Sequence, residues 1–451
     1  MDTQEQKFQK MTQGPVGGII CRLAVPCIIS MLVTAFYNMA DTFFVGMLKS
    51  NAATGAVGVV FSMMAIIQAV GFFFGQGSGN YISRELGKKN YEEASVMAAC
   101  GFFGALAAGV VICVLGLVFL EPLAYLLGST DTILPYTKDY LGVILLGAPW
   151  MAASLVLNNQ LRFQGSAVYA MVGIVSGAAL NIVLDPLLIF GLKLGVAGAG
   201  WATIISQFVS FVILLIGCSK GGNIKISLSK LKLRFFYFWQ IARGGLPSLA
   251  RQVLASFATI VLNNVARPHG DAVIAAMSVV QRIVMFGASA MIGFGQGFQP
   301  FCGFNFGAGL YSRVKKGFWF CVKGSLGFLV AISAVVYIFA PQLIGIFRDD
   351  PQVIEFGTLA LRMQCLTFPF QSWIIMSNMM EQVMGRTVPA TFLSVARQGL
   401  FFIPAVLILT FLLDARGIQM AQAAADALTL ICAIPIHAAV LRSLPRTDRK
   451  N

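Results

Sequence analysis

Two carboxylates lie within apolar stretches of the N-terminal half, and each has polar neighbours at helical spacing. In AFYNMADTFFVG, Tyr37 and Asn38 precede Asp41 by four and three residues, which places all three on one helix face. In LNIVLDPLLIFG, Asn181 precedes Asp185 by four residues. Carboxylate, amide and hydroxyl oxygens together can bind a proton or a hard cation such as Na⁺. The two acids therefore predict an ion-binding site.

Further oxygens can come from neighbouring segments of the chain. Tyr140 in KDYLGVILLG and Thr203 in WATIISQ each offer a hydroxyl group. Pro186 lacks a backbone donor and so leaves the carbonyl of Ile182 free to accept. The nine cysteines are scattered singly, and no CxxC pair or Cys/His cluster occurs. We therefore expect no cofactor and no bound metal other than Na⁺.

The segments that hold these residues are predicted to be membrane helices. The chain of 451 residues is 57% hydrophobic and 11% charged, whereas a soluble protein carries about 25% charged residues. A helix that crosses a bilayer needs about 20 apolar residues, and stretches of that length recur along the chain. The sequence therefore predicts an all-α integral membrane protein.

We expect twelve transmembrane helices, with basic residues gathered at one set of their ends. The helices are predicted near residues 16–47, 54–82, 94–118, 133–156, 168–190, 194–217, 239–266, 272–302, 317–340, 355–382, 388–412 and 418–441. Most Lys and Arg fall in loops and span ends on the side of the N-terminus, and Arg282 is the one basic residue placed inside a span. The positive-inside rule assigns that side to the cytoplasm.

This orientation predicts a multi-pass protein of a bacterial-type cytoplasmic membrane with both termini in the cytoplasm. The net charge of +14 then reflects orientation and contact with anionic membrane lipids. It does not indicate nucleic-acid binding.

The two halves of the chain repeat at a separation of 220 residues. The stretch GQG at 75–77 recurs at 295–297. Other pairs at this separation are Gly87 and Gly307, Tyr91 and Tyr311, Gly104 and Gly324, Pro149 and Pro369, Asn158 and Asn378, and Gly165 and Gly385. Pro26 recurs one residue later than this separation, as Pro247. Neither GQG continues as a Walker or dinucleotide motif, so we interpret these glycines as sites of close helix approach or of helix bending at the inner end of each lobe.

Each repeat holds six spans, so both halves enter the membrane from the same side. This predicts two six-helix lobes related by a parallel pseudo-two-fold repeat, an arrangement found among secondary transporters. We place the N-terminal lobe at 1–217, a basic cytoplasmic linker at 218–238 and the C-terminal lobe at 239–451. A cleft between two rocking lobes would open to each side in turn. We expect the chain to act as a monomer.

Departures from the repeat point to function. Asp41 and Asp185 align with apolar positions of the second half, so we expect buried carboxylates in the N-terminal lobe alone. The roles of Asp426 and Arg282 stay open. Glu381 stays open between a transport role and a salt bridge to Arg386, which lies nearby in the sequence.

The cleft is expected to carry polar and flexible side chains that suit ligands of varied shape. The candidates are Tyr37, Asn38, Asn158, Met285 and Arg282. Pro26, early in the first span, predicts a kink that can act as a hinge.

These motifs resemble those of the multidrug and toxic compound extrusion (MATE) transporters over essentially the whole chain. The resemblance lies in YNMADTFFVG, in LNIVLDPLLIFG, in the duplicated GQG stretches and in the double set of six spans. It implies two bundles that export organic, often cationic, compounds in exchange for Na⁺ or H⁺. It also implies an N-lobe ion site, which carries over to Asp41, Asp185, Asn181, Tyr140 and Thr203. Other members use acids in spans seven and ten, but span seven has none here.

We therefore expect a secondary active antiporter that exports organic cations by alternating access. One alternative is a lipid-linked oligosaccharide flippase of the wider superfamily, for which extra spans or several cationic residues in the cleft would be expected. A membrane enzyme is disfavoured, because we expect no buried histidine, no metal cluster and no nucleophile beside a base. A channel would show ohmic flux rather than coupled exchange.

Overall fold

The computed structural model describes residues 4–47, 51–445 and 447–448, except for the side chains of Asn38, Asp41, Thr42, Asn51, Ala53 and Thr54. Every regular element in these ranges is a helix. An apolar segment in a bilayer must satisfy its own backbone polar groups, and a helix does this within one segment. The all-α prediction is confirmed.

The N-terminal half supplies the first six spans. They are α2 (Val16–Gly46), α3 (Asn51–Gly87), α4 (Tyr91–Val118), α6 (Leu134–Phe163), α7 (Ala167–Pro186) with the π-helical turn η1 (Leu187–Gly191), and α8 (Gly195–Cys218). The short helices α1 (Gln4–Gln13) and α5 (Leu120–Leu126) lie outside the spans. The connector to the second half contains one 3-10 turn, η2 (Leu228–Lys230).

The C-terminal half repeats this order. Its spans are α9 (Phe235–Ala266), α10 (Asp271–Gly307), α11 (Tyr311–Ile338), α13 (Pro351–Thr367) with α14 (Gln371–Val383), α15 (Thr387–Val395) with α16 (Phe402–Leu413), and α17 (Ala415–Ser443). A 3-10 turn, η4 (Phe368–Phe370), separates α13 from α14, and a π-helical turn, η5 (Ala396–Leu400), separates α15 from α16. The short elements are η3 (Arg267–His269) and α12 (Ala340–Phe347).

Eleven helices of the described chain are long and apolar enough to cross a membrane. The tenth predicted span does not form one continuous helix, because it breaks at η4 around Pro369. Its repeat partner, Pro149, lies inside the continuous helix α6. When α13 and α14 are counted together as one span, the twelve predicted spans are confirmed, and the chain is a multi-pass membrane protein.

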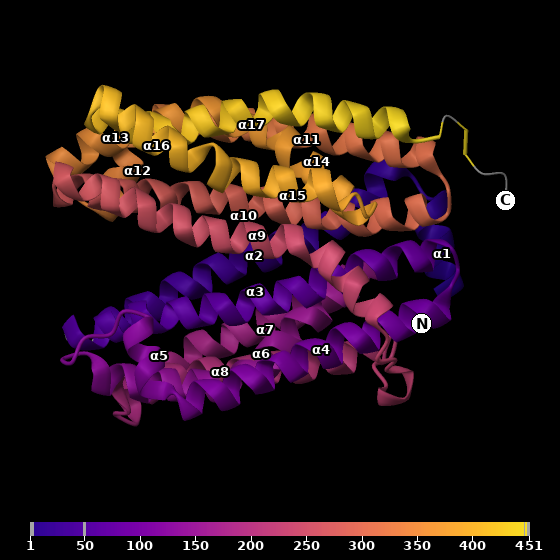
Figure 1. Ribbon diagram of the computed structural model, residues 1–451, viewed down its shortest axis with the longest axis horizontal. Helices are drawn as coiled ribbons and strands as arrows, with labels where there is room; N and C mark the ends of the chain where they lie inside the picture. Colours follow the sequence, from indigo (N-terminus) through magenta and orange to yellow (C-terminus); the bar gives the residue numbers. More distant parts are fainter. Residues whose placement is uncertain (1–3, 48–50, 446, 449–451) are drawn as a thin grey trace.

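The two halves form two bundles side by side, and both termini lie at the same end of the molecule (Figure 1). We call this the basic end. It also holds residues 88–90 and the connector at 219–234, since Lys89 forms an ion pair with Glu5 and Lys230 lies 3.8 Å from Glu92.

The repeat is visible in side-chain contacts as well as in helix order. Asn158 donates from Nδ2 to the carbonyl of Ala170 at 3.0 Å, and Asn378 donates to the carbonyl of Ala390 at 2.6 Å. Gly165 and Gly385 follow these helices with φ of 77° and 76°, which explains why glycine recurs there. The same turn and the same hydrogen bond therefore occur once in each half.

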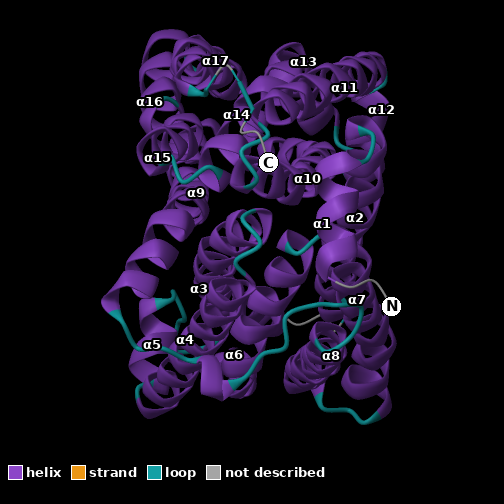
Figure 2. Ribbon diagram, turned by 90° about the vertical axis from the view of Figure 1, so that its right-hand side faces the viewer, coloured by secondary structure: helices purple, strands orange, loops and turns teal. Residues whose placement is uncertain are grey.

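The first helix of each half bridges the two bundles. Helix α2 packs on α7 of its own half and on α10 of the other, whereas α9 packs on α15 and on α3. Figure 2, which views the molecule from the basic end, shows α2 and α9 on opposite flanks between the bundles. Each bridge carries the repeated proline, Pro26 in α2 and Pro247 in α9. A bend at either proline would change how the bundles sit relative to each other.

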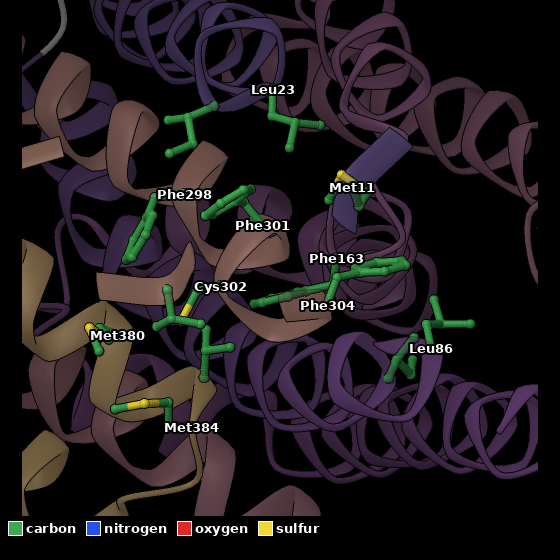
Figure 3. Packing of buried hydrophobic residues seen from close by; sticks show 14 of the residues in the cluster. Met11, Leu23, Leu86, Phe163, Phe298, Phe301, Cys302, Phe304, Met380 and Met384 are labelled. Atoms are coloured by element: carbon green, nitrogen blue, oxygen red, sulfur yellow. The ribbon is translucent and has the colours of Figure 1, made fainter. Parts of the chain in front are cut away.

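One apolar cluster joins the bundles near the basic end. Phe163 and Leu86 of the N-terminal half pack in it with Phe298, Phe301 and Phe304 of α10 (Figure 3). Two other clusters each lie within a single half, one of them around Tyr140 and the other around Phe402. Apolar burial therefore binds the two halves together at the basic end.

The expectation that buried carboxylates occur in the N-terminal lobe alone is wrong. Glu381 is 0% exposed and Asp426 is 2% exposed, and both lie in the C-terminal half. Asp426 accepts from Arg397 Nε at 2.7 Å and from Gln422 Nε2 at 2.9 Å. Arg397 lies in η5, the π-helical turn of the eleventh span. The structure thus gives Asp426 a structural partner.

Glu381 has an unexpected partner. Its Oε1 lies 3.0 Å from Nδ1 of His437, which is also 0% exposed, so the expectation of no buried histidine is wrong. Of the two alternatives left open for Glu381, the described residues do not form the salt bridge to Arg386, and Arg386 donates instead to Ser443 at 3.3 Å. Residues 56 positions apart meet here because α14 and α17 pack together.

Replacing Asp426 by Ala is expected to destabilise the protein by about 3 kcal/mol, because Arg397 would keep a largely buried charge without its carboxylate. Thermal unfolding in detergent measures the effect. The double variant Asp426→Leu with Arg397→Met should recover most of the loss, since it removes both charges. An unchanged unfolding temperature in the single variant would contradict a structural role for this pair.

Candidate substrate cleft and ion site

A cavity of about 360 Å³ lies between the two halves. The N-terminal half lines it with α2, α3, α6, α7 and α8, and the C-terminal half lines it with α9 and α10. The wall contains both apolar groups, such as Met31, Ile67 and Phe72, and polar groups, such as Gln68, Gln207 and Gln252. Such a surface suits amphipathic small molecules.

Glycines let helices of the two halves come into close contact between the cavity and the basic end. A Cβ atom at Gly77 would overlap the carbonyl oxygen of Ile241, and one at Gly297 would overlap Ala24. Gly87 and Gly307, which are repeat partners, lie against each other across the two halves. The predicted role of the repeated glycines in close helix approach is confirmed.

A polar network lies beside the glycines and uses the glutamines of both GQG stretches. Arg162 donates to Gln296 at 2.7 Å and to Asn159 at 2.6 Å. Gln76 donates to Asn159 at 3.1 Å, and Gln299 donates to Gln76 at 3.4 Å. The network therefore crosses from one half to the other at the base of the cavity.

Arg84 adds a second polar link between the halves. Its Nη1 donates to the carbonyl of Val383 in α14. Neither Arg84 nor Arg162 was singled out as a candidate from the sequence. The sequence does show that Arg84 ends a helix containing GQG and that Arg162 ends a helix rich in Asn. Only the packing of the helices shows that the two arginines link the lobes.

The described residues of the predicted ion site are deeply buried in the N-terminal half. Asp185 and Tyr140 are 0% exposed, and Asn181 and Thr203 are 1% exposed. Asn181 donates from Nδ2 to Oδ1 of Asp185 at 3.4 Å, as the four-residue spacing predicts. The ring of Tyr140 packs against Gly200 of α8, the helix that carries Thr203. Helices α6, α7 and α8 thus bring these groups into one interior.

Several oxygens in this interior are available to a ligand. Asn181 Oδ1, Thr203 Oγ1 and Ser206 Oγ are buried and accept no hydrogen bond from any described residue. An unsatisfied buried polar atom costs about 1–3 kcal/mol, and a cation or an ordered water would offset that cost. Asn181, Thr203 and Ser206 also line the cavity. This donor set fits Na⁺ or a protonated carboxyl group.

The structure leaves part of the predicted site undescribed. The side chains of Asp41 and Asn38 lie outside the described residues. Tyr37, one turn earlier on α2, is buried and lines the cavity. The assignment of Asp41 to the ion site stays a prediction.

The remaining cleft candidates divide into two groups. Met285 lines the cavity with 41% of its side chain exposed, and Asn158 lines it while holding its repeated bond to Ala170. Arg282 is exposed but is not among the lining residues. The structure thus brings Met285 and Asn158 to the cleft and places Arg282 elsewhere on α10.

Arg251 was not among the cleft residues predicted from the sequence. It lies midway along α9 and lines the cavity, although Arg282 was the one basic residue expected inside a span. The available signal was SLARQVLASF, a basic residue surrounded by helical, largely apolar sequence at the centre of the seventh span.

The sequence model of the MatE family matches residues 26–187 and 247–408. The two matches begin at the repeated prolines, Pro26 and Pro247, and each lies within one half of the chain. Together they span well over half of the protein.

Comparison with individual proteins agrees with this match. The multidrug export protein MepA of Staphylococcus aureus (strain NCTC 8325 / PS 47) is 28% identical over 440 residues, which cover 96% of each chain. A structure described as the outward-facing conformation of a multidrug resistance MATE family transporter of the MOP superfamily has a TM-score of 0.91 at 26% identity, covering 97% of this chain and 98% of that chain.

A MATE structure in the bent conformation has a TM-score of 0.90 at 26% identity and covers 98% of this chain and 99% of that one. The fold, the repeat and both halves of the sequence thus agree. The chain belongs to the MatE family, and it is a membrane transporter rather than an enzyme.

Proposed function

We propose that this transporter exports organic compounds, including cations, in exchange for H⁺ or Na⁺ by alternating access. The observation that carries the proposal is that the ion-site residues Asn181 and Thr203 also line the cleft between the lobes. Ion binding and substrate binding therefore share one wall. The relative named as a multidrug export protein supports the substrate class.

We place the basic end in the cytoplasm of a bacterial-type inner membrane, with both termini there. The lobes meet at this end through glycines and through the Arg162 network. The cleft is then closed to the cytoplasm, which corresponds to an outward-facing state. The relative described as outward-facing supports this interpretation.

Coupling would act through the acids of the N-terminal lobe. With Asp41 and Asp185 ionised, a compound enters the cleft from the cytoplasmic side. After the lobes rock outward, H⁺ or Na⁺ binds the acids and neutralises them, and α2 bends at Pro26 so that the compound is released. Each net charge that moves inward across 100 mV supplies about 2.3 kcal/mol, which supports roughly a 50-fold gradient per ion for a compound without net charge. A compound with one positive charge needs a second ion for the same gain, because its own charge moves outward.

The proposal also covers the cofactor, the partners and the domain bounds of the transporter. No cofactor takes part, membrane lipids surround the helices, and the chain acts as a monomer. The N-terminal lobe spans 1–217, the linker spans 218–238 and the C-terminal lobe spans 239–451.

Ethidium efflux from proteoliposomes tests the coupling. The protein is inserted so that its cytoplasmic end lies inside the vesicle, where the dye is loaded. An inward H⁺ gradient in Na⁺-free buffer, or an inward Na⁺ gradient at equal pH, should then accelerate dye efflux. Dissipating the active gradient with an ionophore should return efflux to the background rate. Equal efflux with and without either gradient would contradict antiport.

Translocation of a lipid-linked oligosaccharide is a second candidate function. It is favoured by the two arginines, Arg162 and Arg251, that line the cleft. Comparing the translocation of a lipid-linked precursor with dye efflux in the same vesicles separates the two functions. Precursor translocation without dye efflux would favour the flippase.

A further inference from the structure

Arg251 carries a charge at membrane depth, and no described residue pairs with it. It lies midway along α9 with its side chain on the cavity wall. Within the described ranges it forms no hydrogen bond or ion pair, unlike Arg397, which pairs with Asp426. A charge within a membrane span is costly and is kept where it meets a partner or a ligand. The cavity is therefore where the partner of Arg251 must be sought.

The charge on the described cavity wall is entirely positive. Among the lining side chains that the structure describes, Arg162 and Arg251 are the charged ones. Asp185 is buried in the lobe and is not a lining residue. A cleft lined by charges of one sign concentrates ligands of the opposite sign.

The two arginines differ in how free they are to bind. Arg162 already donates to Gln296 and Asn159, so its guanidinium is held in place and contributes mainly its charge. The planar guanidinium of Arg251 keeps all its donors, and this geometry matches a carboxylate or phosphate group through two parallel hydrogen bonds. Gln252, the next residue on α9, also lines the cavity and adds an amide donor.

We propose that Arg251 binds the carboxylate or phosphate group of transported compounds, assisted by the charge of Arg162. This inference rests on the proposed export function and narrows its substrate class. The organic cations that the cleft accepts also carry an acidic group, so zwitterions bind better than simple cations.

A matched pair of dyes tests this preference directly. A rhodamine free acid and its methyl ester share one cationic ring system and differ by a single carboxylate. Fluorescence polarisation of each dye with the full-length protein in detergent gives two dissociation constants. The wild type should bind the free acid about tenfold more tightly than the ester, the size expected for a charge-assisted hydrogen bond.

Variants of Arg251 assign the preference to this residue. Arg251→Gln should remove the preference by weakening free-acid binding about tenfold, while ester binding stays the same or improves. Arg251→Lys keeps the charge and should retain part of the preference. Arg243→Gln is the matched control, because Arg243 is an exposed arginine on the same helix outside the cavity. Since Arg251 has no described partner to lose, its replacement should not lower the thermal unfolding temperature.

A lipid phosphate could supply the same acidic group. A second arm measures translocation of a fluorescent phosphatidic acid in phosphatidylcholine vesicles by the wild type and by Arg251→Gln. If Arg251→Gln loses the preference for the free-acid dye, the bound group belongs to a small-molecule substrate. If Arg251→Gln loses translocation of phosphatidic acid, the bound group is a lipid headgroup. Both results support the anion subsite.

Equal affinity of the wild type for both dyes, together with lipid translocation that Arg251→Gln does not change, would overturn the subsite. This outcome is distinct from failure of the export proposal. Dye binding in detergent needs no gradient, so it is unaffected if ion coupling is absent. Conversely, ion-driven ethidium efflux can proceed without an anion subsite.

Discussion

Replacing Asp185 by Asn is expected to lower ion-driven ethidium efflux at least about tenfold. Asp185 is fully buried and accepts from Asn181, and asparagine keeps the size of the side chain while removing its titration and its charge. The variant can then neither take up a proton nor offer a carboxylate to Na⁺. The ion gradient can then no longer drive release of the substrate, although the cleft that binds the substrate is unchanged.

Two further variants make this result specific. Asp41→Asn should have the same effect, because both acids are proposed to serve one ion site. Asp271→Asn is the matched control, because Asp271 is an exposed acid at the start of α10. This variant should transport at the wild-type rate. Dye binding in detergent should persist in Asp185→Asn, which separates loss of coupling from loss of the cleft. Gradient-driven efflux at the wild-type rate would remove Asp185 from the mechanism.

The fold was predictable because its signals are local and periodic. Runs of about 20 apolar residues define spans, and the separation of 220 residues between Gly165 and Gly385 marks two turns with the same positive φ. The one span that did not form continuously, α13 with α14, breaks at Pro369 although Pro149 leaves α6 intact. A proline shows where a helix can break, whereas packing decides whether it does.

The Asn181–Asp185 bond was predictable for a similar reason, since both residues lie on one helix. The pairs between Arg397 and Asp426 and between Glu381 and His437 were not. Their partners lie on different helices, and one sequence without tertiary contacts does not say which helices touch. Arg251 escaped notice because the basic residues that follow the cytoplasmic linker were assigned to the end of the seventh span, but α9 begins at Phe235 and carries Arg251 to the cleft.

Adding a methyl group at the repeated glycines is expected to prevent closure at the basic end. In Gly77→Ala the new Cβ would overlap the carbonyl oxygen of Ile241, and in Gly297→Ala it would overlap Ala24. These contacts are with backbone atoms or a short side chain, so no flexible side chain can move away. Overpacking of this kind costs about 1–3 kcal/mol, and opening the closure relieves it.

The closed state should therefore lose population by roughly 5- to 150-fold, and transport should fall with it because one of the two alternating states becomes rare. Gly324→Ala is the matched control, since no atom lies within 4 Å of the added methyl group on α11. Hydrogen–deuterium exchange in residues 73–87 and 293–307 measures the closure, and faster exchange is expected in Gly77→Ala and Gly297→Ala alone. If both variants transport normally and exchange like the wild type, the glycine contact is not the cytoplasmic closure. If exchange rises at these helices while dye binding in detergent persists, the GQG repeats serve the change of state rather than the binding of substrate.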